Sequence, residues 1–168
     1  MMRLSDYIRT YGDKTIDPDK LTDVLAAHAS VPEYKPNKGE TYYTVHGAGD
    51  VHQEVWQSHN VLDWSMGRWE QGNVFPTREA AEFEAERRKV KAGLERLARE
   101  SGPVSWSNRD ISKVCLYYDH DDSSVKDTSN NFVQHEGSTY FATGAAAMGA
   151  ISTIGEERIK KYLFGVDK

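Results

Sequence analysis

Residues 72–101, GNVFPTREAAEFEAERRKVKAGLERLARES, contain the feature that most constrains the fold, a long helix with clear signals at both ends. Thr77 can cap the helix, because a threonine hydroxyl accepts hydrogen bonds from the free amides of a first helical turn. Glu79 follows where the positive end of the helix dipole favours an acidic side chain. Gly102 and Pro103 then end the helix. The rest of the chain must therefore arrange itself around one long helix.

Apolar or small side chains recur along this helix at heptad-like intervals, with one charged residue among them. They are Ala80, Phe83, Val90, Leu94 and Leu97, and Arg87 fills the missing step. The stripe either packs on the chain's own sheet or forms a seam with a partner helix in which Arg87 sets the register. Two heptads are too short a run to favour the seam.

A basic cluster lies on the same helix and is a candidate partner-binding surface. Its members are Arg87, Arg88, Lys89 and Lys91. The cluster could contact phosphate, which would make the chain a nucleic-acid-binding module. Glutamates both precede and follow it, however, and mixed charges at helical spacing are more typical of a solvated helix face laced with ion pairs.

Length and composition indicate one globular domain with a small N-terminal addition. The chain has 168 residues, 38% of them hydrophobic and 28% charged, which is enough apolar content for a real core. The net charge of −5 argues against a general nucleic-acid coat and is too small for a DNA mimic. We expect residues 1–40 to form a helical segment and linker, with a helix over 18–29, and residues 41–168 to form an α+β domain.

A single cysteine, Cys115, excludes an intrachain disulfide, and no apolar run is long enough for a signal peptide or a membrane span. We therefore expect a cytoplasmic protein with no membrane partner. Nothing in the sequence sets its oligomeric state.

The domain has the pattern of two ββ(β)α-like halves, 41–101 and 113–164, with antiparallel strands packed under helices. In the first half we expect strands at 41–45, 51–56 and 74–75 around an irregular stretch at 58–71. In the second half we expect strands at 113–119, 125–133 and 139–141, then helices at 144–153 and 156–164. Two further matches suggest an internal repeat. Phe75 and Thr77 align with Phe141 and Thr143 at an offset of 66, and the Tyr-Tyr pair at 42–43 aligns with the pair at 117–118 at an offset of 75, leaving nine extra residues near 58–71.

The histidines and acidic residues give no convincing metal site. A hairpin loop at 47–50 would place His46 opposite Val51 and direct His52 to the other face of the sheet. No nearby cysteine completes a zinc site with His46, His52 or His59. The acidic run at 119–122 lacks the glycine and glutamate of a calcium loop and is more typical of a turn between strands. We expect no metal and no cofactor.

No catalytic motif is present. Cys115 lies in an apolar strand, where a buried and inert thiol is expected. The chain has no nucleophile elbow, phosphate-cradling glycine loop or paired-histidine zinc helix. We therefore expect a non-enzymatic protein.

Tryptophans gather between the first hairpin and the long helix. Trp56, Trp64 and Trp69 either close the sheet as core residues or, where exposed, form a contact surface, because tryptophan is a typical interface anchor. Trp64 and Trp69 are the candidate partner-binding pair.

Two phrases, GNVFPTREAAEFEAERRKV at 72–90 and IGEERIKKYLFGV at 154–166, resemble a group of small, mostly uncharacterised accessory proteins from phages and prophages of Gram-positive bacteria. The resemblance covers about 40–168. It departs at Pro76 and at Gly144-Ala145, where that group usually has charged residues. It implies a viral accessory gene acting in the host cytosol and carries over no catalytic residue.

These observations lead to two main expectations of function, beside a third, a small enzyme, which would need a pocket holding converging His, Asp or Cys groups. The first is a non-enzymatic accessory protein that binds a host protein, such as an inhibitor of a bacterial defence system like a CRISPR nuclease. The alternative is a nucleic-acid-binding module that uses the basic cluster of the long helix.

Overall fold

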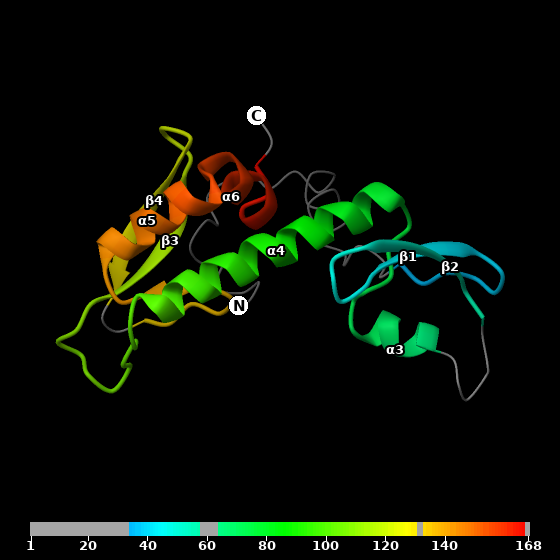
Figure 1. The fold of residues 1–168 in the computed structure, drawn as a ribbon, viewed down its shortest axis with the longest axis horizontal. Helices are drawn as coiled ribbons and strands as arrows, with labels where there is room; N and C mark the ends of the chain where they lie inside the picture. Colours follow the sequence, from blue (N-terminus) through cyan, green and yellow to red (C-terminus); the bar gives the residue numbers. More distant parts are fainter. Residues whose placement is uncertain (1–33, 58–63, 131–132, 167–168) are drawn as a thin grey trace, which may run out of the picture. The chain divides into compact units, whose positions relative to one another are not determined.

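The first half of the domain begins with a two-stranded antiparallel hairpin (Figure 1). The computed structural model describes residues 34–57, 64–130 and 133–166. Strand β1 (Thr41–Val45) pairs with β2 (Val51–Val55), and Val45 lies opposite Val51. On the other edge of β1, Tyr43 pairs with Phe75 through reciprocal backbone hydrogen bonds of 2.9 Å. Phe75 therefore acts as a one-residue third strand.

A short helix and a long helix complete this half. Helix α3 (Trp64–Glu70) lies in the stretch for which we expected no regular structure. Helix α4 (Arg78–Glu100) has the start predicted from the sequence, because the Thr77 side chain accepts a hydrogen bond from the Ala80 amide at 3.2 Å. Ser101 ends it, and its hydroxyl donates to the carbonyl of Ala98.

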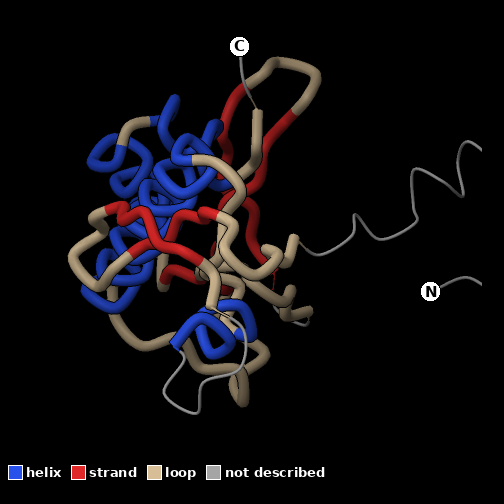
Figure 2. The backbone as a smooth tube through the Cα atoms, turned by 90° about the vertical axis from the view of Figure 1, so that its right-hand side faces the viewer, coloured by secondary structure: helices blue, strands red, loops and turns tan. Residues whose placement is uncertain are grey.

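The second half contains a three-stranded sheet and two helices (Figure 2). Strand β3 (Lys113–Asp119) lies between β4 (Ser124–Asn130) and β5 (Tyr140–Phe141), and both neighbours are antiparallel to it. Helices α5 (Gly144–Ile154) and α6 (Glu156–Leu163) follow. The predicted strand 125–133 is wrong at Val133, which lies outside any strand, and its residues 131–132 lie outside the described residues.

Helix α4 contributes to two hydrophobic clusters in the part of the chain that the structure describes. Its first turns place Ala81 and Ala85 against Val45 and the partly buried Phe75 of the first half. Its later turns contribute to the larger cluster of the second half. That cluster contains Val90, Leu94, Ala98, Val114, Val125, Phe141, Ala147, Ala150, Ile151 and Ile159. The chain therefore joins its two halves through one helix.

The predicted stripe on α4 is correct only in its later part. Val90 and Leu94 are buried, and Leu97 is partly buried against the same cluster. At the start of the helix the buried face consists of alanines instead, and Phe83 remains 37% exposed. Small residues there let the helix approach the two-stranded sheet closely. The helix covers its own sheets, as the first interpretation of the stripe proposed.

Both halves use the same order of pairing, with the first strand between the second strand and a short third segment ending in phenylalanine. The Thr143 side chain accepts from the Ala146 amide at 3.2 Å, as Thr77 does from Ala80. The proposed alignment of the strands is nevertheless wrong. Phe75 pairs with Tyr43, 32 residues earlier, and Phe141 pairs with Val114, 27 residues earlier. The first half thus has five extra residues between these partners, not nine.

The α+β class with antiparallel strands preceding helices is confirmed. The division of the chain at residue 40 stays a prediction. The expected N-terminal helix at 18–29 lies outside the described residues. Among those described, no helix is both long and apolar enough to cross a bilayer.

Candidate functional site

The tryptophans divide between core and surface. Trp56 is buried, and its ring packs edge-on against Tyr42 at a centroid distance of 5.8 Å. Trp69 is half-buried. Trp64, the first residue of α3, is 79% exposed and is the most exposed large apolar side chain of the described residues. Of the predicted pair, Trp64 and Trp69, only Trp64 is exposed enough to be a strong candidate for partner contact.

Buried polar contacts fix the helix that carries Trp64. The Tyr42 hydroxyl, fully buried on β1, donates to the Ser65 hydroxyl at 3.3 Å and accepts from Arg68 at 3.1 Å. Arg68 also lies 3.2 Å from the Glu54 carboxylate on β2. Partial burial opposes the charge of Arg68, but its hydrogen bond to Tyr42 and the nearby Glu54 outweigh that effect and raise the pKa of Arg68. These contacts hold α3 on the hairpin and hold the Trp64 backbone in place.

The two hairpin histidines lie on one face, which corrects the prediction. Val45 pairs with Val51, so His46 and His52 point the same way, and their rings stack at 4.1 Å between centroids. The loop is one residue shorter than expected, because the His46 amide donates to the Asp50 carbonyl. A one-residue shift in register reverses the face of every following side chain.

This arrangement does not produce a metal centre. Glu54 lies 3.9 Å from His46 Nε2, but the same carboxylate oxygen contacts Arg68. Across the described part of the chain, no three histidine, cysteine or acidic side chains are arranged to hold a metal ion. His59 lies outside the described residues.

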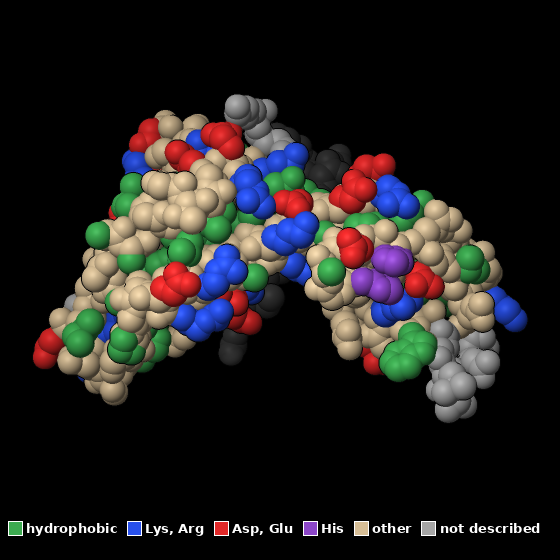
Figure 3. All heavy atoms as spheres, viewed as in Figure 1, with side chains coloured by type: hydrophobic (Ala, Val, Ile, Leu, Met, Phe, Trp, Pro, Cys, Tyr) green, Lys and Arg blue, Asp and Glu red, His purple; other side chains and the backbone are tan. Residues whose placement is uncertain are grey.

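The basic cluster on α4 is largely paired with glutamates. Arg87 and Arg88 both donate to Glu84, at 2.6 and 2.9 Å, and Lys89 donates to Glu86 at 2.8 Å. Partial burial opposes ionisation of Glu84, but the hydrogen bonds from the two arginines outweigh it and lower the pKa of Glu84. Figure 3 shows the same interspersed pattern of basic and acidic side chains on the face that it presents.

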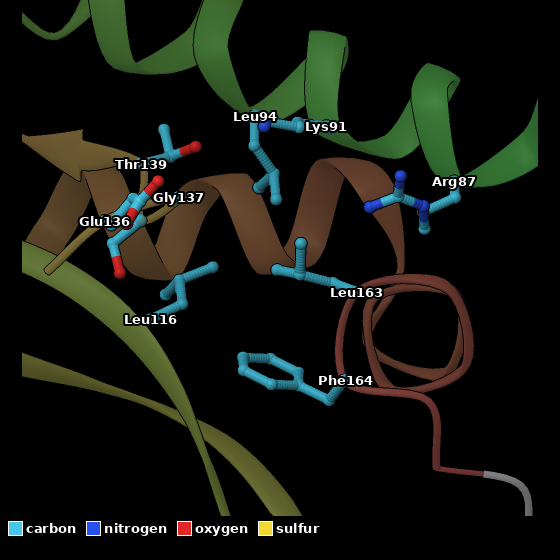
Figure 4. A pocket seen from close by; sticks show the side chains of 10 residues that line it. Arg87, Lys91, Leu94, Leu116, Glu136, Gly137, Thr139, Leu163 and Phe164 are labelled. Atoms are coloured by element: carbon cyan, nitrogen blue, oxygen red, sulfur yellow. The ribbon is translucent and has the colours of Figure 1, made fainter. Parts of the chain in front are cut away.

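Lys91, the last member of the cluster, differs from the other three. It has no ion-pair partner within the described residues, and it lines a cavity of about 300 Å³ together with Arg87 (Figure 4). The apolar part of the lining consists of Leu94, Leu116, Leu163 and Phe164. Glu136 is the remaining charged group of the lining, which contains no histidine, cysteine or aspartate. The cavity therefore offers an apolar floor with a charged rim and no nucleophile paired with a base.

Cys115 and the acidic run at 119–122, the other groups considered for chemistry, have structural partners. Cys115 is buried, and burial raises the pKa of its thiol despite a hydrogen bond with Tyr140. The acidic run at 119–122 forms a turn, as the sequence predicted. Lys126 bridges Asp119 and Asp122 there, and its hydrogen bonds lower the pKa of both carboxyl groups.

The chain matches no known protein-family model, no curated protein and no solved structure.

Proposed function

We propose that this chain is a non-enzymatic phage or prophage accessory protein that acts in the host cytosol by binding a host protein through Trp64. The observation that carries the proposal is the 79% exposure of Trp64. A defence complex such as a CRISPR nuclease is the target class that we favour, on the resemblance of residues 72–90 and 154–166 to phage accessory proteins.

Rigid presentation supports a contact role for this tryptophan. Binding is stronger when the contacting group is already held in its bound position, because less conformational freedom is then lost. The neighbouring Ser65 is 6% exposed and bonded to Tyr42, so the backbone at Trp64 is anchored on the hairpin. A large aromatic side chain on an anchored helix is typical of the centre of a protein interface.

The ion pairs on α4 make nucleic acid the weaker alternative. Phosphate binding by Arg87, Arg88 or Lys89 would have to compete with Glu84 and Glu86. Affinity for nucleic acid depends mainly on cations that neutralise phosphates. Since three of the four cluster residues are already paired, part of that gain would be offset by the loss of these exposed ion pairs.

The test is affinity capture from lysate of a Gram-positive host, with and without nuclease, using wild type, Trp64→Ala and Met148→Ala. Met148 is 46% exposed on α5 and serves as a matched apolar control. We expect one host protein to survive nuclease treatment with wild type and Met148→Ala, and about 30-fold weaker binding for Trp64→Ala, in line with interface hot spots.

Equal capture by Trp64→Ala would refute the proposal, as would capture of no host protein. Recovery that disappears with nuclease, and that weakens steeply with salt and on neutralising Arg87, Arg88 and Lys89, would support the nucleic-acid alternative. Circular dichroism must show that Trp64→Ala remains folded, which we expect because so exposed a side chain contributes little to stability.

A further inference from the structure

Strand β2 has a free edge among the residues that the structure describes. The His46 amide donates to the Asp50 carbonyl at one end of the ladder, and the Trp56 amide donates to the Glu40 carbonyl at the other. Hydrogen-bonded pairs alternate in an antiparallel ladder, so the even-numbered residues of β2 bond toward β1. The N–H and C=O groups of the odd-numbered residues point away from β1, and within the described residues no group pairs with them. These residues are Val51, Gln53 and Val55.

The edge of β1 that faces away from β2 shows the same alternation of backbone hydrogen bonds. There the odd-numbered Tyr43 exchanges both backbone hydrogen bonds with Phe75. The Asn73 side chain likewise bonds both the amide and the carbonyl of Val45. One edge of this sheet is thus satisfied by the chain itself, whereas no described residue pairs with the β2 edge.

The corresponding edge in the second half is partly covered. Strand β4 occupies the place of β2, and the outward amide of Val125 donates to Glu156 of α6 at 3.0 Å. The charged Lys126, held by Asp119 and Asp122, lies on the same strand. Charges, prolines and covering elements are the usual means by which proteins keep sheet edges from pairing. The sequence of β2, VHQEV, has one charged residue, Glu54, but no lysine or proline, and no other element closes its edge in the described structure.

The sequence of β2 is complementary to itself in the antiparallel direction. If two β2 strands pair about an axis at Gln53, Val51 of one copy lies opposite Val55 of the other, and all outward backbone groups are satisfied. His52 then lies opposite Glu54 of the second copy in a non-hydrogen-bonded pair, where side chains approach most closely. This complementarity occurs twice by symmetry, as an isologous two-fold interface requires.

We propose that two copies of this chain associate edge to edge through β2, in antiparallel register centred on Gln53, to form a continuous four-stranded sheet. The inference rests on the open edge and on the pairing of His52 with Glu54, and it is independent of the proposed function. It also assigns a role to Val55, which is 50% exposed in the single chain and gains an apolar cross-strand neighbour in the pair.

Sedimentation equilibrium tests association. Wild type should approach twice the monomer mass of 19.0 kDa as its concentration rises. Gln53→Lys should remain a monomer, because two lysines would face each other across the axis. Ser129→Lys, the same type of change on the β4 edge, should associate like wild type. A wild type that stays monomeric at every concentration would overturn the proposal, as would equal association of Gln53→Lys.

Charge at position 52 tests the pairing. His52→Glu would oppose Glu54 and should weaken association about tenfold, whereas His52→Lys should strengthen it, since opposite charges stabilise cross-strand pairs. Shifts in the same direction, or no shift in either variant, would contradict this register.

Disulfide trapping tests the axis. In Gln53→Cys the two introduced residues would have Cα atoms about 5.5 Å apart, within the range of a disulfide. In Val55→Cys they would be about 14 Å apart along the strands, which is too far. With oxidised glutathione, Gln53→Cys should therefore form covalent dimers much faster than Val55→Cys. Equal rates would refute the proposed axis.

Discussion

Truncation of Phe141 to alanine should destabilise the protein far more than the same change at Phe75, although both occupy the same place in their halves. Phe141 on β5 is fully buried in the larger cluster, and its sheet also contacts α5 and α6. Phe75 is only partly buried against a cluster whose buried members are Val45, Ala81 and Ala85.

Burial sets the expected magnitudes. Removing a fully buried phenylalanine costs about 3–5 kcal/mol, because the transfer free energy is lost and a cavity remains. A partly buried ring loses roughly 1–2 kcal/mol, in proportion to the smaller area removed from water. Since a domain's total stability is about 5–15 kcal/mol, Phe141→Ala should be near the limit of folding and Phe75→Ala should not.

Urea denaturation followed by far-UV circular dichroism measures both free energies of unfolding. Phe141→Leu keeps most of the volume and should cost less than about 1.5 kcal/mol. If Phe75→Ala proved as costly as Phe141→Ala, the second half would not be the main core, and the reasoning from burial would be refuted.

Three further predictions follow from the caps, ion pairs and thiol. Thr77→Ala and Thr143→Ala should each lose about 1 kcal/mol in urea denaturation, since each removes a helix cap; an unchanged midpoint in either would contradict the capping geometry. The ionised Glu84 stabilises the fold at pH values above its ordinary pKa of 4.5. This contribution to the free energy of unfolding is lost as the pH falls below that value and through the lowered pKa of Glu84 in the folded protein. Glu84→Gln should therefore make the free energy of unfolding depend less on pH on the acid side. Cys115 should react with a thiol reagent slowly in the native protein and rapidly in urea; fast native labelling would show that it is exposed.

The long helix could be predicted from sequence because its signals are local. Thr77, the acidic first turn and the Gly102-Pro103 stop all lie within or next to the element that they define. The same holds for α5, where Thr143 precedes a run of small residues. Such signals do not depend on what the helix packs against.

The hairpin register and the strand alignment could not be predicted in the same way. The loop closes between His46 and Asp50 through one backbone hydrogen bond, and a shift of one residue was enough to assign His52 to the wrong face. The two Tyr-Tyr pairs are similar in sequence, but Phe75 and Phe141 pair with Tyr43 and Val114. Ladder partners are set by tertiary packing, not by local similarity.

The candidate site depends on long-range contacts that sequence does not display. Helix α3 is held by Tyr42 and Glu54, which lie on strands and precede their partners in α3 by 14 to 26 residues, so its local pattern looked irregular. The same contacts leave Trp64 exposed, whereas Trp56 packs on Tyr42. The pairing of the basic cluster, by contrast, could be anticipated from glutamates three and four residues away.

The most direct test of a host-protein contact at Trp64 is photo-crosslinking in living host cells, with a photoreactive amino acid placed at position 64 or at position 148. We predict a covalent adduct with one host protein from position 64 that is absent from position 148. No adduct from position 64, or the same adducts from both positions, would contradict it.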